Sequence, residues 1–200
     1  MSETDRLLRQ GFTLEYITLG WNVVGSAIVI AAAIHAHSVA LVGFGLDSVV
    51  EIGASTVVIW QLKGADKGRE RRALRIIAAS FVVLATYVLV QSVRALLLRM
   101  HPESSPVGIA WLAVTFVVMV ALATGKGRVG AKLQNPVLVA EGRVTMVDAY
   151  LAASVLVGIV LNSACGWWWA DPIAGLVIVF YGFKEGRHAW MEAKALRSDG

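Results

Sequence analysis

Six long apolar runs alternate with short polar segments along the chain, at residues 12–36, 39–62, 74–98, 107–123, 136–161 and 167–183. A helix that crosses a bilayer needs about 17–25 mostly apolar residues, so all six runs qualify, the last only just. The runs are long and lack the alternation of a strand, and in hydrocarbon only helices or closed barrels satisfy their own backbone hydrogen bonds. The pattern therefore predicts an all-α membrane protein with six transmembrane helices.

The composition agrees with this class. Hydrophobic residues make up 57% of the chain and charged residues 16%, whereas a soluble domain has about 45–50% and about 25%. Cys165 is the one cysteine, which excludes an internal disulfide framework and a cysteine-rich metal cluster.

The basic residues indicate an orientation. Of the 18 Lys and Arg, all but Arg94, Arg99 and Arg143 lie in segments on the same side of the predicted membrane as the N-terminus. The positive-inside rule places that side, and both termini, in the cytoplasm. We therefore expect a cytoplasmic segment at 1–11, a membrane domain at 12–183 and a short cytoplasmic tail at 184–200, in the plasma (inner) membrane. The positive charge is a topology signal, and no nucleic-acid partner is expected.

Acidic side chains lie near the middle of two runs. Asp47 and Glu51 lie four residues apart near the centre of the second run, and Asp148 lies at the centre of the fifth. Four residues return to the same face of a helix, and a carboxylate at the bilayer centre costs at least about 2.5–3.5 kcal/mol. Asn22 lies at a similar depth in the first run. These residues are therefore candidates for a functional site.

The charge balance narrows the chemistry. Arg143 is the one candidate for a membrane-embedded cation, since Arg75 and Arg94 lie near the ends of their run, and one arginine cannot neutralise three carboxylates. At least two of the acids must then be protonated or share a cation from outside. A site that accepts either a proton or a metal ion suits a proton-coupled cation transporter. The alternative is that the acids stay protonated and hydrogen-bond to neighbouring helices.

Three segments resemble the cation diffusion facilitators. "SVALVGFGLDSVVEIGAS" resembles their second helix, "AEGRVTMVDAYLAASVLVGIVLN" their fifth, and "WWWADPIAGLVIVFYG" the start of their sixth. The resemblance spans almost the whole chain. It implies a cation-efflux-type six-helix bundle that exports a divalent metal (zinc, cobalt, cadmium, iron or manganese, with zinc foremost) in exchange for protons. It also implies a homodimer in the membrane, with no enzyme activity and no catalytic cofactor.

The resemblance assigns residues singly. Asp47 and Glu51 take the places of the family's acidic pair, and Asp148 takes the acid that ends its H-x-x-x-D motif. The histidine position of that motif holds Val144, which cannot bind a metal, and we expect a form without the family's usual cytoplasmic metal-binding domain. With these departures, the sequence resembles a compact branch of the superfamily, similar to the TMEM-type zinc-binding membrane proteins.

The replacement for the histidine is open. Glu141 lies on the same helix face as Asp148, but seven residues rise about 10.5 Å, too far for both to hold one ion. We therefore expect Glu141 nearer the cytoplasmic mouth, either as an entrance ligand or proton acceptor, or paired with Arg143 or with a cation of another helix. Asn22 is either a metal ligand or a polar group packed between helices, and water could complete the shell.

Other polar residues receive simpler interpretations. Glu15 is expected at the lipid interface, and Asp171 as the N-cap of the sixth helix. His35 and His37 lie in the outer turn, where they could catch an exiting ion. The segment "GKGRVGAK" at 125–132 contains G-x-G-x-x-G, but it joins two membrane helices and is interpreted as a flexible basic loop.

Two other functions remain open from the sequence. The first is a membrane metal-binding or regulatory protein that does not transport. The second is a proton-coupled exporter of small organic cations, because the buried acids alone would allow it.

Overall fold

The computed structural model describes residues 3–62 and 67–198. These residues form the six predicted helices and contain no strand. The helices are α1 (Glu3–Ala36), α2 (Val39–Leu62), α3 (Lys67–Leu97), α4 (Pro106–Leu133), α5 (Pro136–Cys165) and α6 (Ala170–Ser198). The prediction of an all-α bundle is therefore confirmed.

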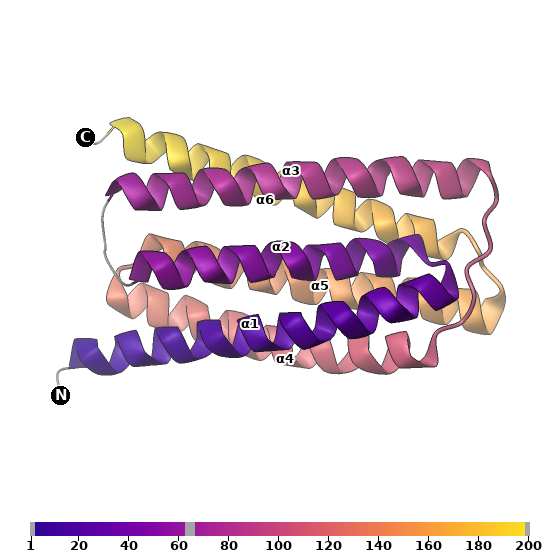
Figure 1. Cartoon of the computed structure of the whole chain (residues 1–200), viewed down its shortest axis with the longest axis horizontal. Coiled ribbons are helices and arrows are strands. Elements are labelled where there is room, and N and C mark those ends of the chain that lie inside the picture. The colour runs from indigo at the N-terminus through magenta and orange to yellow at the C-terminus, as the bar shows by residue number, and fades with distance from the viewer. Residues whose placement is uncertain (1–2, 63–66, 199–200) are drawn as a thin grey trace.

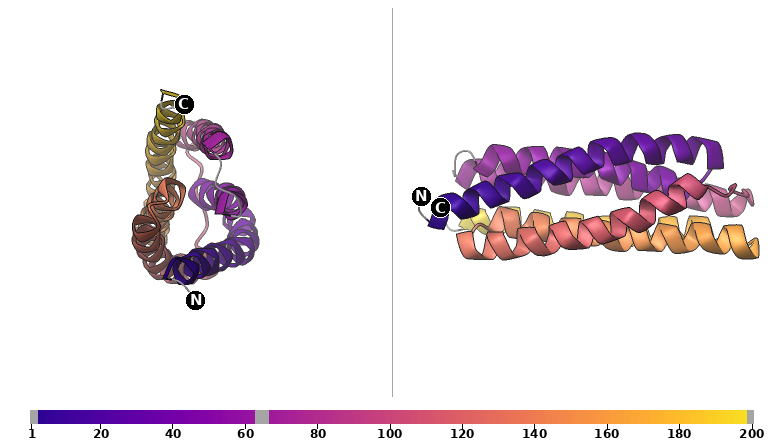
Figure 2. Two further views of the ribbon diagram at one scale, coloured as in Figure 1. Left: turned by 90° about the vertical axis from the view of Figure 1, so that its left-hand side faces the viewer. Right: turned by 90° about the horizontal axis from the view of Figure 1, so that it is seen from below.

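The six helices form two layers of three. The layer of α1, α2 and α3 faces the layer of α4, α5 and α6 (Figure 2). Viewed along the bundle, α2 and α5 lie between the α1–α4 pair and the α3–α6 pair. Both chain termini lie at one end of the bundle, which we call the termini end (Figure 1). Two helices with central positions, α2 and α5, thus carry the three acids of interest.

Five of the described helices, α1 to α5, are long and apolar enough to cross a membrane. Large apolar side chains such as Val83, Val117 and Phe180 are exposed on the outside of the bundle, as expected for a surface that contacts lipid. The remaining helix, α6, falls short by the same measure but packs closely along α3.

The fourth helix is longer than the sequence predicted. It continues to Leu133 and ends at Gln134, whose backbone is left-handed and whose N–H contacts Ala131 and Gly130 carbonyls. The prediction that 125–132 is a flexible loop is therefore wrong. The extension packs tightly on α5: a Cβ on Gly142 would lie 2.9 Å from the Gly127 nitrogen. The close contact between the α4 and α5 backbones stabilises residues 125–132 as a helix, one face of which points into the bundle.

Asp171 has a different role from the predicted one. Its carboxylate accepts a hydrogen bond from the Ser38 hydroxyl, and from the backbone N–H of Val39 and Ala40 at 3.0 and 3.3 Å. It therefore caps α2 rather than its own helix α6. The free N–H groups and the positive end of the α2 dipole attract a buried carboxylate from the neighbouring α6.

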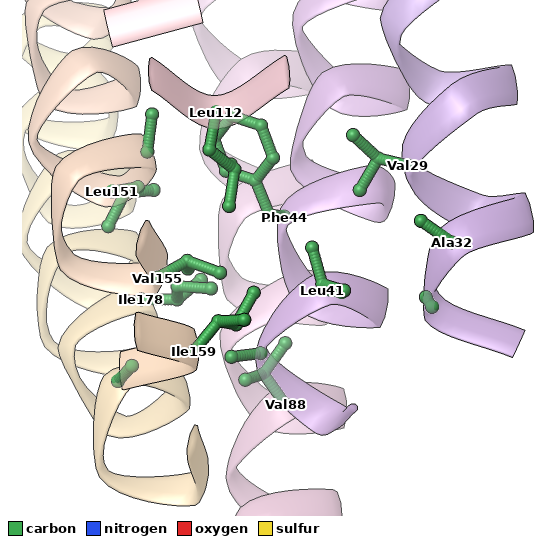
Figure 3. Packing of buried hydrophobic residues seen from close by; sticks show 14 of the residues in the cluster. Val29, Ala32, Leu41, Phe44, Val88, Leu112, Leu151, Val155, Ile159 and Ile178 are labelled. Carbon is green, nitrogen blue, oxygen red and sulfur yellow. The ribbon is translucent and has the colours of Figure 1, made fainter. Parts of the chain in front are cut away.

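Two apolar clusters fill the ends of the bundle. The far-end cluster gathers side chains from all six helices, among them Leu41, Phe44 and Leu112 (Figure 3). The termini-end cluster joins the end of α2 to the α4–α5 turn through Val58, Val129, Val137 and Leu138. The mid-membrane acids lie between these clusters along α2 and α5.

Candidate functional site

The three predicted acids lie at the buried interface of α2 and α5. Asp47, Glu51 and Asp148 are 3%, 1% and 2% exposed. The Asp148 carboxyl interacts electrostatically with both Asp47 and Glu51. The antiparallel course of the neighbouring helices α2 and α5 thus brings together the carboxyl groups that the sequence placed at one depth.

Asn22 joins this group from α1. Its Nδ2 donates a hydrogen bond to Glu51 Oε2 at 2.6 Å, and the side chain is buried. The bond fixes one oxygen of Glu51 and directs the carboxylate between the helices. We call Asn22, Asp47, Glu51 and Asp148 the mid-membrane site.

Several oxygens of the mid-membrane site remain available. Glu51 Oε1 and both carboxyl oxygens of Asp148 are buried and have no hydrogen-bond partner in the structure. No salt bridge joins any of the three acids to a described basic side chain. Buried polar atoms are normally paired, so these oxygens mark a place that a proton or a cation would stabilise.

The carboxyl groups do not form a finished metal shell in this conformation. Within residues 3–62 and 67–198, no group of three or more His, Cys, Asp or Glu side chains is arranged to hold a metal ion. A bound ion would therefore draw the carboxylates together. Neither His35 nor His37 contributes, since both are exposed at the far end of the bundle.

Glu141 lies outside the mid-membrane site. Its Oε1 accepts hydrogen bonds from the Lys126 ammonium and the Ser55 hydroxyl, both at 3.3 Å. Among the alternatives left open by the sequence, pairing with a cation of another helix is the one observed. Its separation from Asp148 follows from the two turns of α5 between them.

Lys126 was missed because the fourth helix was predicted to end at residue 123. Its side chain on α4 is fully buried, and its Nζ lies 3.3 Å from Glu15 Oε2 and donates to Thr145 Oγ1 at 3.1 Å. Together with the contact to Glu141, this forms the lysine cluster of Glu15, Lys126, Glu141 and Thr145. A helical interpretation of 125–132 would have revealed a lysine facing the bundle.

Glu15 and Arg143 depart from their predicted places. Glu15 is fully buried in the lysine cluster and does not lie at a lipid interface. The spacing of Glu15, Thr18 and Asn22 on one face of α1 was the signal for this. Arg143 does not enter the bundle beside the acids: its side chain is 48% exposed and pairs with Glu192 of α6, because position 143 points away from the face that carries Glu141 and Asp148.

The lysine cluster and the mid-membrane site form one continuous polar column. Four helices contribute to it, and all of its members are buried: Glu15, Thr18, Asn22, Asp47, Glu51, Ser55, Lys126, Glu141, Thr145 and Asp148. The termini-end cluster closes the column on one side and the far-end cluster on the other. This arrangement isolates a file of charged and polar groups from both ends of the bundle.

Comparison with known proteins gives the family. Residues 16–195 match the model of the cation efflux transmembrane domain. The chain belongs to this cation efflux family. Transmembrane protein 163 of Xenopus laevis is similar to it at 22% identity over 189 residues, which is 88% of this chain and 67% of the relative.

Family membership assigns the bundle to the cation transporters of the membrane. The sequence resemblance placed Val144 at the position of the family's helix-5 histidine. Val144 packs with Ala54 and Phe81 in an apolar cluster and carries no donor atom.

Proposed function

We propose that the protein exports a divalent metal ion in exchange for protons, with Asp47, Glu51 and Asp148 as the ligands that move the ion. The observation that carries the proposal is the set of buried carboxyl oxygens between α2 and α5 that have no hydrogen-bond partner in the structure. The membership in the cation efflux family supports cation transport. Asn22, through its contact with Glu51, positions one ligand and can complete the shell with its own amide oxygen.

The donor set constrains the ion. Carboxylate and amide oxygens suit Mn²⁺ and Mg²⁺, whereas Zn²⁺ favours sites that include nitrogen or sulfur but accepts carboxylates. Zinc is proposed as the first candidate because of the family resemblance, and manganese as the second because Val144 supplies no nitrogen ligand. Catalytic cofactors and enzyme activity form no part of the proposal.

Proton coupling follows from the chemistry of the ligands. A metal ion binds deprotonated carboxylates, so binding releases protons and protons compete with the ion. An ion that enters from the cytoplasm would displace protons from the mid-membrane site. Protons arriving from the other side would then release the ion and return with the empty carrier.

The two apolar clusters are proposed as alternating gates. The termini-end cluster would open toward the cytoplasm, where the positive-inside rule places both termini, and the far-end cluster would open outward. We also propose a homodimer in the plasma (inner) membrane, on the family resemblance.

The first test is metal flux in proteoliposomes. We expect Asp148→Asn to abolish uptake of Zn²⁺ and Mn²⁺ driven by a pH gradient, because the substitution removes a charged ligand that α5 supplies. The matched control is Glu192→Gln, which changes an acid on the outside of α6 and should leave the flux unchanged. Flux through Asp148→Asn at the wild-type rate would contradict the proposal.

The same assay separates the other two functions. A metal-binding regulator would bind Zn²⁺ in the wild type and lose the binding in Asp148→Asn, but neither protein would give metal flux. An exporter of organic cations would bind such compounds in competition with Zn²⁺ and move them in place of the metal.

A further inference from the structure

The lysine cluster contains a buried positive charge that the proposed transport cycle does not use. The Lys126 ammonium lies within 3.3 Å of carboxylate oxygens of Glu15 and Glu141. It also contacts Thr145 Oγ1 at 3.1 Å. Two helices, α1 and α5, therefore supply oxygens around one cationic nitrogen from α4.

The oxygens around the ammonium are more than a lysine needs. Both oxygens of Glu15 and Oε2 of Glu141 are buried without a hydrogen-bond partner in the structure, and Glu15 Oε2 makes an ionic contact with Lys126. Two carboxylates around one ammonium leave one negative charge uncompensated. A divalent cation in the same place would compensate both carboxylates.

We propose that Lys126 is a tethered cation that occupies a second metal position in the polar column. Its ammonium group takes the place of a divalent ion between Glu15 and Glu141, with Thr145 as a neutral ligand. The oxygen-only donor set matches hard cations such as Mn²⁺ and Mg²⁺. Its carboxylate Glu141 lies about 10 Å from Asp148 along α5, so the two positions use different carboxylates.

The tethered charge has a consequence for the column. With the ammonium in place, a mobile cation near Glu15 and Glu141 meets a like charge and is excluded from that position. If the mid-membrane site is the transport site, as proposed above, Lys126 limits the column to one mobile ion. Whether Lys126 occupies the second metal position does not depend on the mid-membrane site being the transport site.

The test counts bound Mn²⁺ by electron paramagnetic resonance on the purified full chain in lipid nanodiscs. We expect Lys126→Met to bind one more Mn²⁺ per chain than the wild type, because methionine keeps the length of the side chain and removes its charge. Adding Glu141→Gln should abolish the additional ion. Lys132→Met, at an exposed lysine of the same helix, is the matched control and should bind as the wild type does.

The outcomes are distinct from those of the proposed function. Adding Asp148→Asn to Lys126→Met should remove an ion bound at the mid-membrane site but leave the additional one. A folded Lys126→Met chain with wild-type stoichiometry would overturn the tethered-cation proposal, whatever happens at Asp148.

A folding defect is also informative. Lys126→Gln, which retains a hydrogen-bond donor for Thr145, is measured in parallel. If either variant is unstable because two carboxylates are left unpaired, Mn²⁺ should raise its melting temperature toward that of the wild type, and Glu141→Gln should remove this dependence. Variants that remain misfolded in Mn²⁺ would overturn the proposal, since an ion that fits the position would restore the missing charge.

Discussion

At the scale of single residues, the mid-membrane site depends on one amide as well as on its acids. Asn22 is the polar group that fixes the direction of Glu51, through a hydrogen bond of 2.6 Å. An amide that holds a ligand carboxylate raises metal affinity without supplying charge. The roles of Asn22 and of the three acids are therefore separable by substitution.

We expect Asn22→Ala to weaken Zn²⁺ binding about 10- to 100-fold, the usual effect of losing a group that orients a metal ligand. Isothermal titration calorimetry on the purified protein measures the change. Ser26→Ala, one turn further along α1, is the control, because Ser26 bonds only within its own helix. Equal affinities in Asn22→Ala and wild type would show that the amide is only a packing group.

At the scale of elements, the close contact between α4 and α5 decides where the lysine cluster lies. Gly142 has no room for a side chain, since a Cβ there would lie 2.9 Å from the Gly127 nitrogen and 3.2 Å from the Ala123 oxygen. Helices in membranes associate through such small residues because their backbones can then approach closely. The approach carries Lys126 to Glu141 and Thr145.

We expect Gly142→Ala to destabilise the protein by about 1–3 kcal/mol, because the methyl group would force apart two backbones that cannot yield easily. The measurement is thermal unfolding in detergent, with Mn²⁺ counting as a second measure of the lysine cluster. Gly53→Ala on α2 is the matched control, since a Cβ there meets no atom within 4 Å. A melting temperature as high in Gly142→Ala as in Gly53→Ala would contradict the packing argument.

The start of α2 shows a second contact between elements. Asp171 on α6 accepts hydrogen bonds from the first N–H groups of α2. A side chain from the other layer therefore holds the N-terminus of α2, the helix that carries Asp47 and Glu51. The two layers are thereby joined at one end, while the acids lie further along α2.

At the scale of the whole molecule, the polar column is closed at both ends by apolar clusters. Val58 belongs to the termini-end cluster and Leu41 to the far-end cluster, and both side chains are fully buried. Transport by alternating access would require each cluster to open while the other stays closed. The two-layer arrangement, with three helices on each side of the column (Figure 2), would allow this by rocking.

We expect reciprocal labelling of cysteines placed in the two clusters. In a Cys165→Ser background, Val58→Cys and Leu41→Cys should react slowly with a water-soluble maleimide in the closed state. A pH gradient with Zn²⁺ present should raise the reactivity of one position and lower that of the other, as mass spectrometry would show. Parallel changes at both positions would argue against alternating gates. Ser104→Cys, exposed in the connection between α3 and α4, is the control for general exposure to water.

The sequence by itself determined the helices and the depth of the acids. Long apolar runs have few alternatives in a membrane, so six helices followed directly, and the spacing of Asp47 and Glu51 placed both carboxylates on one face of α2. Depth along a helix is a local property, because each residue advances the chain by a fixed rise. Asn22, Asp47, Glu51 and Asp148 were therefore identifiable from the order of the residues alone.

The tertiary structure decided which polar side chains of different helices contact one another. The pairing of Glu141 with Lys126, the burial of Glu15 and the capping of α2 by Asp171 all join helices whose contacts the sequence does not specify. Periodicity gives the faces of one helix but not the neighbour that each face contacts, which depends on how side chains of two helices interdigitate. For that physical reason the lysine cluster, and with it the tethered cation, is defined only by the packing of α1, α4 and α5 against one another.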